Sequence, residues 1–469
     1  MVKITQSGIK DFEAFVSDVM ESYGAQGVAV SIFGKNEVYY EKFFGYRDSE
    51  KKLEIDEDTI FGMASISKSF ACLAIMQLVE KGVLDLDALV SEYIPEFSGK
   101  NQKGVRLRHL LSHAAGFFPE KRIQLKDVAQ QVGVWDNREN EDLTYIPELA
   151  EEGIKQIAGR LDDRTKHIGK PGELMSYSND SYGLIADIVK RHGGEKTYSD
   201  YVKKHILEPL EMNRSSLEFE APSKDANGTN LYVYRNGQLE ASRDFYDNAL
   251  VLMAGGAMKS TIADLRKYTL MYLGEGVSAN DKTLLGQYYT REMFKPRQFY
   301  RFGQYYGFGL STKFMDDITL IGHGGSLTGV ANMFQWSPQL ECGIIVFCNT
   351  SEFPAGVVAD AATRLANGKK IVSKRDLFTD TPWSTDTIKA ACGFYKSGEG
   401  ALYEITYENE TLGVKMNGEV LEIRTVTNDM LLIQKPYNKA DLILCRNNDG
   451  EVWGIRTGGR IIPKGEIYE

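Results

Sequence analysis

Residues 61–70 read FGMASISKSF, a strand-like approach that runs into an amphipathic helix. Apolar residues then recur at helical spacing as far as Lys81, and Gly82 ends the pattern. Ser65 and Lys68 are three residues apart, so both side chains lie on one face of that helix and the ammonium meets the hydroxyl. The N-terminus of a helix also favours a developing negative charge. This stretch predicts a serine nucleophile whose proton is handled by a lysine.

The Ser-x-x-Lys spacing is not specific by itself, because it occurs at Ser7, Ser49 and Ser65. Ser7 precedes the first helical pattern and Ser49 lies in a charged turn, so only Ser65 stands between a strand and a long helix. The sequence has no GxSxG elbow, which disfavours an α/β-hydrolase. It also has no HExxH and no CxxC pair, and its six histidines are scattered. We therefore expect neither a metal nor a cofactor.

The overall composition excludes several classes of partner. The chain has 469 residues with a net charge of −10 and no long basic run, which argues against nucleic acid and against an anionic membrane surface. No apolar run is long enough to span a bilayer. The first 24 residues lack the apolar core of a signal peptide, and the five scattered cysteines are typical of core residues in a reducing compartment. We expect a cytoplasmic protein, unless a leader has been removed.

Strand patterns lie at both ends of the first 370 residues, with helical patterns between them. We expect an α/β fold of the α+β type, in which helices flank an antiparallel sheet built from both ends of residues 1–370 and a helical subdomain is inserted at about 68–295. A charged, poorly periodic stretch at 119–170 is either an insertion over that subdomain or a surface loop with no role. The predicted strands are Gly27–Phe33, Glu37–Phe44, Asp317–Gly322, Ala331–Ser337 and Cys342–Asn349. One helix is predicted at the N-terminus, with Phe12, Phe15, Val16 and Val19 on one face, and another at Ala355–Ala366. Helical patterns dominate from about Leu107 to Met293.

The chain changes character after a polar linker at 371–384. Residues 385–469 carry short alternating segments separated by turn sequences such as Asn-Gly and Asn-Asn-Asp-Gly. This spacing predicts a second domain, a small all-β meander or barrel. The predicted strands are Ala401–Tyr407, Thr411–Met416, Val420–Thr425, Met430–Gln434, Ala440–Cys445 and Glu451–Arg456.

Several further motifs follow Ser65-Ile-Ser-Lys68 in order along the chain. They are HLLSHAAG at 109–116, PG at 171–172 followed by YSN at 177–179, PLEM at 209–212, AGGAMKST at 254–261 followed by Asp264-Leu265, YGFGL at 306–310 and HGG at 323–325. Together these motifs resemble those of the serine β-lactamase and penicillin-binding-protein superfamily, above all its class C-like branch of esterases and D-aminopeptidases. The resemblance covers roughly residues 10–367.

The resemblance implies the roles of three catalytic residues. Ser65 would be the nucleophile that is transiently acylated. Lys68 and Tyr177 would share its proton, as base in acylation and as proton donor to the leaving group.

The same resemblance implies a set of binding residues. Asn179 would position Lys68 and a substrate amide or carbonyl group. The backbone N–H groups of Ser65 and Ser326 would form the oxyanion hole. His323 and Gly325 would line the cleft, with the glycine allowing a substrate backbone to approach. His323 is either such a substrate contact or a purely structural residue.

One departure from the β-lactamases bears on the substrate. Where they carry Lys-Thr-Gly, this chain has His323-Gly324-Gly325, a weaker site for a β-lactam carboxylate. We therefore expect a serine hydrolase, an esterase or peptidase, that forms an acyl-enzyme with a small ester, an amide or a short peptide, including D-amino-acid amides. One alternative is a D,D-peptidase or β-lactamase on the same fold. Another is a non-catalytic ligand-binding or sensor protein. Assembly into a homo-oligomer is open.

Overall fold

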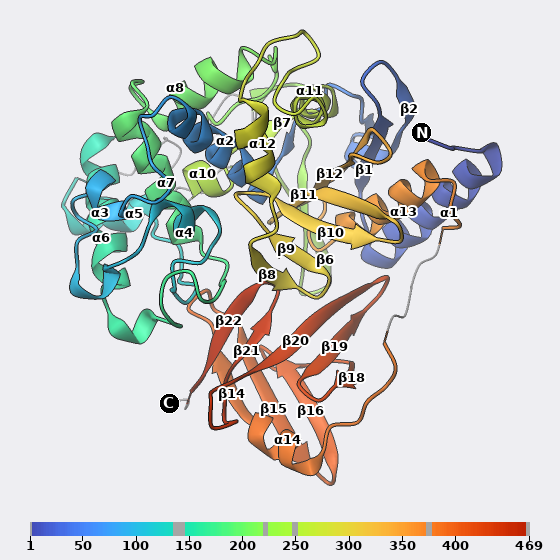
Figure 1. Ribbon diagram of the computed structural model, residues 1–469. Coiled ribbons are helices and arrows are strands. Elements are labelled where there is room, and N and C mark those ends of the chain that lie inside the picture. The colour runs from blue at the N-terminus through green and yellow to red at the C-terminus, as the bar shows by residue number, and fades with distance from the viewer. Residues whose placement is uncertain (1, 135–145, 219–223, 246–251, 372–377, 466–469) are drawn as a thin grey trace.

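A nine-stranded antiparallel sheet, called here the large sheet, forms the centre of the N-terminal part of the molecule (Figure 1). The computed structural model describes residues 2–134, 146–218, 224–245, 252–371 and 378–465. The strand order is β3-β2-β1-β13-β12-β11-β10-β9-β8. The bounds are β1 (Gly27–Phe33), β2 (Val38–Asp48), β3 (Leu53–Glu54), β8 (Gln298–Arg301), β9 (Gln304–Tyr306), β10 (Ser311–Met315), β11 (Ile318–Leu327), β12 (Val330–Ser337) and β13 (Cys342–Cys348).

The two ends of this region meet in the middle of the sheet, as the sequence predicted. Strand β1 pairs with β13 in an antiparallel register that sets Val30 opposite Val346. Both strands are buried along their whole length because both faces of the sheet are covered. Alternate residues serve the two faces: Ile344 packs in the cluster formed with α1 (Gln6–Tyr23) and α13 (Ala355–Ala366), whereas Ile345 packs toward the helical region.

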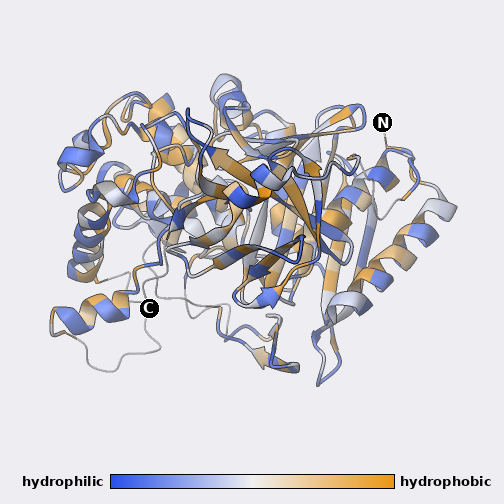
Figure 2. Cartoon of the chain, turned by 90° about the horizontal axis from the view of Figure 1, so that it is seen from below, coloured by the Kyte–Doolittle hydropathy of each residue, from blue (hydrophilic) through white to orange (hydrophobic). Residues whose placement is uncertain are grey.

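The predicted first and last helices of this region are confirmed. The four apolar residues expected on one face of α1 are all buried, and α13 has the predicted bounds. Figure 2 shows the same division of surfaces, since hydrophobic residues gather in the central strands while the outer helices alternate hydrophobic and hydrophilic turns. Each helix therefore places an apolar stripe on the sheet and a polar stripe in solvent.

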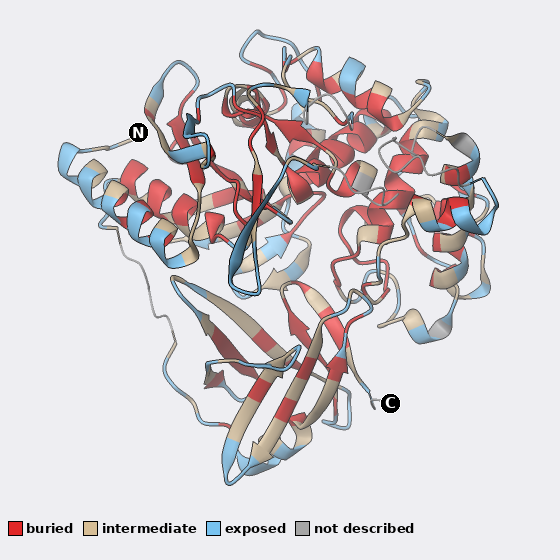
Figure 3. Cartoon of the chain, turned by 180° about the vertical axis from the view of Figure 1, so that it is seen from behind, coloured by how far each residue is buried: buried red, intermediate tan, exposed pale blue. Residues whose placement is uncertain are grey.

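The other face of the large sheet is covered by a helical region. Its central element is α2 (Ser67–Glu80), which is buried around nearly its whole circumference (Figure 3). The surrounding helices are α3 (Val90–Tyr93), α4 (Leu107–Leu111), α5 (Leu125–Gln131), α6 (Pro147–Leu161), α7 (Asn179–His192), α8 (Tyr198–Val202), α10 (Leu252–Gly255), α11 (Ile262–Leu273) and α12 (Gln287–Phe294), with short helical turns η2 (Lys100–Gln102), η4 (Arg164–Lys166) and η5 (Lys203–Leu207). Strand β4 (Phe61–Gly62), just before α2 in the chain, pairs with β7 (Lys259–Ser260), just before α11.

Helices dominate between Leu107 and Met293, as expected, but a hairpin that was not predicted also lies in this stretch. Strands β5 (Leu231–Arg235) and β6 (Gln238–Ser242) pair around Asn236-Gly237. Both turn residues have positive φ, 50° and 76°, as a two-residue hairpin turn of the primed type requires. The Asn-Gly dipeptide was the sequence signal for this hairpin.

The C-terminal part folds as an antiparallel barrel, which agrees with the predicted small all-β architecture. Its strand order is β17-β16-β15-β14-β22-β21-β20-β19-β18. The strands at the two ends of this order, β17 and β18, follow each other in the chain with only Leu421 and Glu422 between them. The Leu421 N–H donates to the Val414 carbonyl of β16, and the Gln434 N–H of β19 donates to the Glu422 carbonyl, so the sheet closes on itself. The bounds are β14 (Gly393–Lys396), β15 (Leu402–Glu408), β16 (Thr411–Met416), β17 (Glu419–Val420), β18 (Ile423–Thr427), β19 (Met430–Lys435), β20 (Asn438–Arg446), β21 (Val452–Thr457) and β22 (Arg460–Gly465).

One rim of the barrel faces the N-terminal part of the molecule (Figure 1). Because neighbouring strands are antiparallel, the turns after β14, β16, β19 and β21 all lie at this rim. From it the Gly459 carbonyl accepts a hydrogen bond from the Tyr177 N–H at 2.9 Å, and the Pro436 carbonyl accepts one from the Tyr23 hydroxyl. The opposite end is covered by α14 (Thr385–Ala391). Part of the predicted linker, 372–377, lies outside the described residues. In the part of the chain that the structure describes, no helix combines the length and hydrophobicity needed to cross a membrane.

Candidate active site

Ser65 lies in a helical turn, η1 (Ala64–Ile66), that leads directly into α2. Lys68 Nζ is 3.2 Å from Ser65 Oγ and donates a second hydrogen bond to the Gly255 carbonyl at 2.8 Å. Ala64 has a φ of 46°, a left-handed backbone conformation that costs free energy for an alanine. Ser67 holds this conformation, because its hydroxyl donates to the Ala64 carbonyl and accepts from the Met258 N–H. The strained turn presents a half-buried Ser65 beside its lysine.

Lys68 is fully buried, and its surroundings disfavour the charged amine. Burial and, second, the positive charge of Arg460 lower the pKa of Lys68 to about 7, while the negative charge of Glu399 acts in the opposite direction. Nζ also lies 5.0 Å from the ring centroid of Tyr177 and 5.2 Å from that of Tyr182. A large fraction of Lys68 is therefore neutral at pH 7 and able to accept a proton.

Tyr177 reaches the same point from the loop before α7. Burial raises the pKa of Tyr177 above its usual value of 10, the electrostatic effect of the neighbouring Tyr300 phenol raises it further, and the hydrogen bond with Ser65 opposes the shift. The phenol is consequently protonated at neutral pH. His113 supports this loop: its ring lies 4.0 Å from the Tyr177 ring, and its Nδ1 accepts a hydrogen bond from the Ser178 N–H.

Strand β11 brings the predicted His323-Gly324-Gly325-Ser326 segment against the turn that carries Ser65. A Cβ added to Gly325 would lie 2.1 Å from the Met63 carbonyl oxygen, so only glycine fits at this contact. At Gly324 the nearest atom to such a Cβ is 3.5 Å away. Ser326 follows Gly325 and is exposed at this edge.

His323 is buried and engaged within the protein. Its Nδ1 is 2.5 Å from the Gly324 carbonyl, and its Nε2 is 2.9 Å from the Tyr306 hydroxyl. The carbonyl can only accept, so Nδ1 carries the proton and Nε2 accepts from Tyr306. Burial lowers the pKa of His323 to about 3, and the charge of Lys68 contributes. A neutral histidine with both nitrogens bonded is not a cation for a substrate carboxylate.

Asn179 is the first residue of α7, two positions after Tyr177. The resemblance implied that it positions Lys68 and a substrate amide or carbonyl group; the described hydrogen bonds of Lys68 go to Ser65 and Gly255. The Asn179 amide instead donates to Glu399 of the barrel rim at 3.0 Å. Asn179 therefore connects the start of α7 to the C-terminal barrel.

The barrel adds two charged residues that the sequence did not point to. Glu399 forms an ion pair with Arg460, and the Arg460 guanidinium lies 4.9 Å from the Tyr177 ring centroid. Neither residue belongs to a local motif, and both lie more than 200 positions from Tyr177 in the chain. Their place at this site could therefore not be predicted from a local sequence pattern. They set part of the electrostatic field at Lys68.

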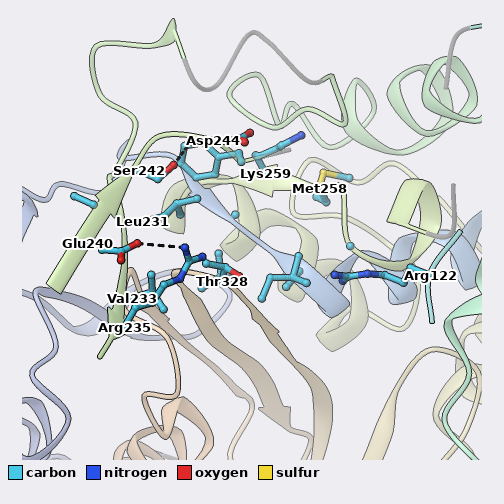
Figure 4. A pocket seen from close by; sticks show the side chains of 17 residues that line it. Arg122, Leu231, Val233, Arg235, Glu240, Ser242, Asp244, Met258, Lys259 and Thr328 are labelled. Atoms are coloured by element: carbon cyan, nitrogen blue, oxygen red, sulfur yellow. Dashed lines mark hydrogen bonds and ion pairs between the residues drawn. The ribbon is translucent and has the colours of Figure 1, made fainter. Parts of the chain in front are cut away.

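A cleft of about 370 Å³ lies next to the Ser65 turn (Figure 4). Ala64 forms one part of its wall, and Thr328 lies between the β5–β6 hairpin and Arg122. On the hairpin side, Arg235 pairs with Glu240 at 3.3 Å. Arg122 comes from the charged stretch at 119–170, so this stretch contributes a side chain to the wall of the cleft. Within the described ranges, no group of three or more potential metal-ligating His, Cys, Asp or Glu side chains comes together.

Comparison with known proteins shows the class of this molecule. The Beta-lactamase family model matches residues 12–368, which is most of the chain and includes every predicted site residue. The chain belongs to the beta-lactamase family of serine hydrolases.

Individual relatives are more distant. The human mitochondrial serine beta-lactamase-like protein LACTB is 29% identical over 299 residues, which cover 53% of this chain and 54% of LACTB. The protein flp of Staphylococcus aureus strain MW2 is 24% identical, with 78% of this chain and 68% of flp covered. The chain thus matches only about half the length of the LACTB proteins.

Solved structures cover nearly the whole chain, barrel included. The octameric penicillin-binding protein homologue from Pyrococcus abyssi is 27% identical, with a TM-score of 0.67 and coverage of 97% of this chain and 99% of that one. The structure of SurE has a TM-score of 0.69 and 18% sequence identity, and the match covers 98% of this chain and 99% of SurE. At this identity the match shows a similar fold alone.

Proposed function

We propose that this protein is a serine hydrolase that forms an acyl-enzyme at Ser65 with a small ester, or with an amide or short peptide that includes D-amino-acid compounds. The observation that carries the proposal is the position of Lys68: a buried amine with a pKa of about 7, its Nζ 3.2 Å from the Ser65 hydroxyl. A general base is most effective when its pKa lies near the working pH.

The lowered pKa of Lys68 suits it to accept a proton, and the raised pKa of Tyr177 keeps its hydroxyl protonated and able to donate one. Neutral Lys68 accepts the Ser65 proton while Oγ forms a bond to the substrate carbonyl carbon. The carbonyl oxygen becomes an oxyanion, for which the proposed donors are the backbone N–H groups of Ser65 and Ser326. On collapse, the bond to the leaving group breaks and the leaving group takes a proton from Lys68, directly or through the Tyr177 hydroxyl. Water then attacks the acyl-enzyme, releases the acid and restores the Ser65 hydroxyl.

The substrate preference follows from His323. A β-lactamase must hold a carboxylate beside the scissile bond, but His323 is neutral here and bonded at both ring nitrogens. Losing a charge-assisted hydrogen bond costs roughly 1.5–3 kcal/mol, or about ten- to a hundred-fold in rate. Asn179 and Gly325 are proposed to bind the substrate carbonyl and backbone in its place. Esters and D-configured amides are therefore favoured over β-lactams.

A β-lactamase or D,D-peptidase remains the second candidate because Arg122 supplies a cation to the cleft. A relative from Yersinia enterocolitica named Beta-lactamase is 27% identical over 227 residues, which cover half of it. The third candidate, a non-catalytic sensor, is disfavoured because Ser65, Lys68 and Tyr177 are all present and adjacent.

Two wider proposals concern assembly and location. A homo-oligomer is proposed because the related Pyrococcus abyssi protein is described as octameric. A cytoplasmic location is proposed because the five cysteines are all free thiols, which suits a reducing compartment, although the LACTB relatives are named mitochondrial.

The proposed function is tested by a substrate panel with intact-protein mass spectrometry. p-Nitrophenyl acetate, p-nitrophenyl butyrate, D-alanyl p-nitroanilide and nitrocefin are compared by kcat/KM at one pH, and a penicillin is added to detect a stable adduct. An ester or D-amide should have the highest kcat/KM, and Ser65→Ala should carry no adduct. Faster turnover of nitrocefin than of every other substrate would establish the β-lactamase candidate instead, and no turnover or adduct with any compound would support the sensor.

A further inference from the structure

The interior of the C-terminal barrel is filled at only one end. The half next to α14 is closed by packed side chains, and Trp383 and Ala391 belong to the same cluster. The inward residues of this half, Tyr395, Leu431, Leu442 and Ile455, are fully buried. A barrel of about eight strands is just wide enough for its interior to be filled by side chains or to hold one small ligand. In the half next to α14, side chains fill the interior.

The other half, toward the rim that faces the active site, is hollow. It contains a cavity of about 350 Å³, at the lower end of the 300–1,000 Å³ typical of ligand pockets. Its wall is mainly apolar, formed by Tyr403, Met416, Leu421, Ile433 and Ile462 together with small residues such as Ala440. It has no lining residue in common with the cleft beside the Ser65 turn, so the two cavities are distinct.

Two cations occupy inward-facing positions at the mouth of this cavity. Alternation along β19 places Lys435 on the same face as Leu431 and Ile433, and alternation along β22 places Arg460 on the face of Ile462. Both charged side chains line the cavity. An apolar wall with cations at its entrance matches a molecule with an apolar tail and an anionic head.

The two cations differ in how far they are already neutralised. Arg460 is paired with Glu399, which also lines the cavity. Lys435 has a carboxylate, Glu352, at 3.9 Å, but the Glu352 side chain is 77% exposed and that of Lys435 is 42% exposed. An ion pair this long and this exposed contributes little. Lys435 is thus the group best placed to bind an anionic head.

We propose that the rim half of the barrel is a binding site for a small amphipathic carboxylate, a short- to medium-chain fatty acid or a compound of the same shape. The tail lies among the apolar residues of the cavity, and the carboxylate pairs with Lys435 beside the Arg460–Glu399 pair. This site does not need Ser65, although it shares Arg460 and Glu399 with the surroundings of Lys68.

The proposal is tested by isothermal titration of the full chain carrying Ser65→Ala with octanoate and, in parallel, with octan-1-ol. The Ser65→Ala background prevents acylation, and the wild-type protein should bind octanoate with the same affinity. We expect one octanoate per chain. Ala440→Trp, which fills the cavity, should abolish binding of both compounds, whereas Val420→Trp, at a position 73% exposed on the outside of the barrel, should leave it unchanged.

A charge variant tests the head group without changing the cavity. Lys435→Gln should weaken octanoate binding about tenfold and leave octan-1-ol binding unchanged. Lys415→Gln, which removes an equal charge paired with Glu404 elsewhere on the barrel, should have no effect. Failure of octanoate to bind the unmodified barrel, or binding that survives Ala440→Trp, would overturn the site. Equal loss of octanoate and octan-1-ol in Lys435→Gln would overturn the assignment of the carboxylate.

Discussion

Asn179 and Glu399 are separated by 220 positions in the chain, yet the Asn179 amide donates a 3.0 Å hydrogen bond to the Glu399 carboxylate. This contact joins the start of α7, two residues after Tyr177, to the rim of the C-terminal barrel. Through it and through Arg460, the barrel adds one negative and one positive charge to the surroundings of Lys68. The basicity of the proposed catalytic base is therefore partly set by a part of the chain outside the matched family region.

The pH dependence of hydrolysis should report these two charges in opposite directions. Because Lys68 must be neutral to accept a proton, kcat/KM should rise with pH through a limb near pH 7. Arg460→Met removes a positive charge that lowers the Lys68 pKa, so the limb should move to higher pH. Glu399→Gln removes a negative charge that raises it, so the limb should move to lower pH.

The pH profiles of kcat/KM for an ester substrate provide the measurement, with Lys415→Met, on the barrel but away from the rim, as the control. Shifts in the same direction for Arg460→Met and Glu399→Gln would contradict the electrostatic account. An unmoved limb in both variants would mean that the titrating group is not Lys68.

Lys68 and Tyr177 should behave as one unit. We expect Lys68→Ala and Tyr177→Phe each to lower kcat on the order of 10³-fold or more, and the double variant to lose little beyond the larger single effect, because groups that share one proton path are not additive. Single-turnover kinetics with a p-nitrophenyl ester measure the chemical step directly. Fully additive losses would argue for two independent roles.

Much of this site follows from local sequence, and the rest does not. Ser65 and Lys68 are recognisable because one helical turn brings them together, and Tyr177 because its neighbours form a motif. Glu399 and Arg460 reach the site only through packing of the barrel rim, so no window of sequence contains the information. The β5–β6 hairpin is a different case, because the Asn236-Gly237 dipeptide is a pattern from which its turn could have been predicted. Strands β14 and β22 were not predicted: β14 has four residues, and Pro463 interrupts the pattern of β22.

Adjacent glycines of β11 offer a matched test of the packing beside Ser65. Gly325→Ala would place a Cβ 2.1 Å from the Met63 carbonyl oxygen, so the strand or the strained turn must move. We expect at least a hundred-fold loss of kcat, since displacements of about 1 Å cost that much. Gly324→Ala meets its nearest neighbour at 3.5 Å and should keep both activity and Tm nearly unchanged. Kinetics and thermal unfolding of the pair decide the matter, and equal tolerance of both substitutions would show that β11 does not constrain the nucleophile.

We also propose that residues 1–370 and 385–469 are two domains joined by the linker at 371–384. Limited proteolysis should cut between Lys369 and Thr385 and yield two folded fragments. Because the barrel carries Arg460 and Glu399, the isolated N-terminal fragment should retain Ser65 reactivity with an altered pH limb. Cleavage at many sites inside the barrel before the linker is cut would count against an independent domain.

The central claim is that Ser65 is the nucleophile, and labelling with a fluorophosphonate followed by peptide mapping tests it most directly. The label should be found on the peptide that contains Ser65, at one equivalent per chain. Labelling should disappear in Ser65→Ala and persist in Ser7→Ala and Ser49→Ala, whose serines share the Ser-x-x-Lys spacing without its structural setting. A label on any other serine, or undiminished labelling of Ser65→Ala, would contradict the account.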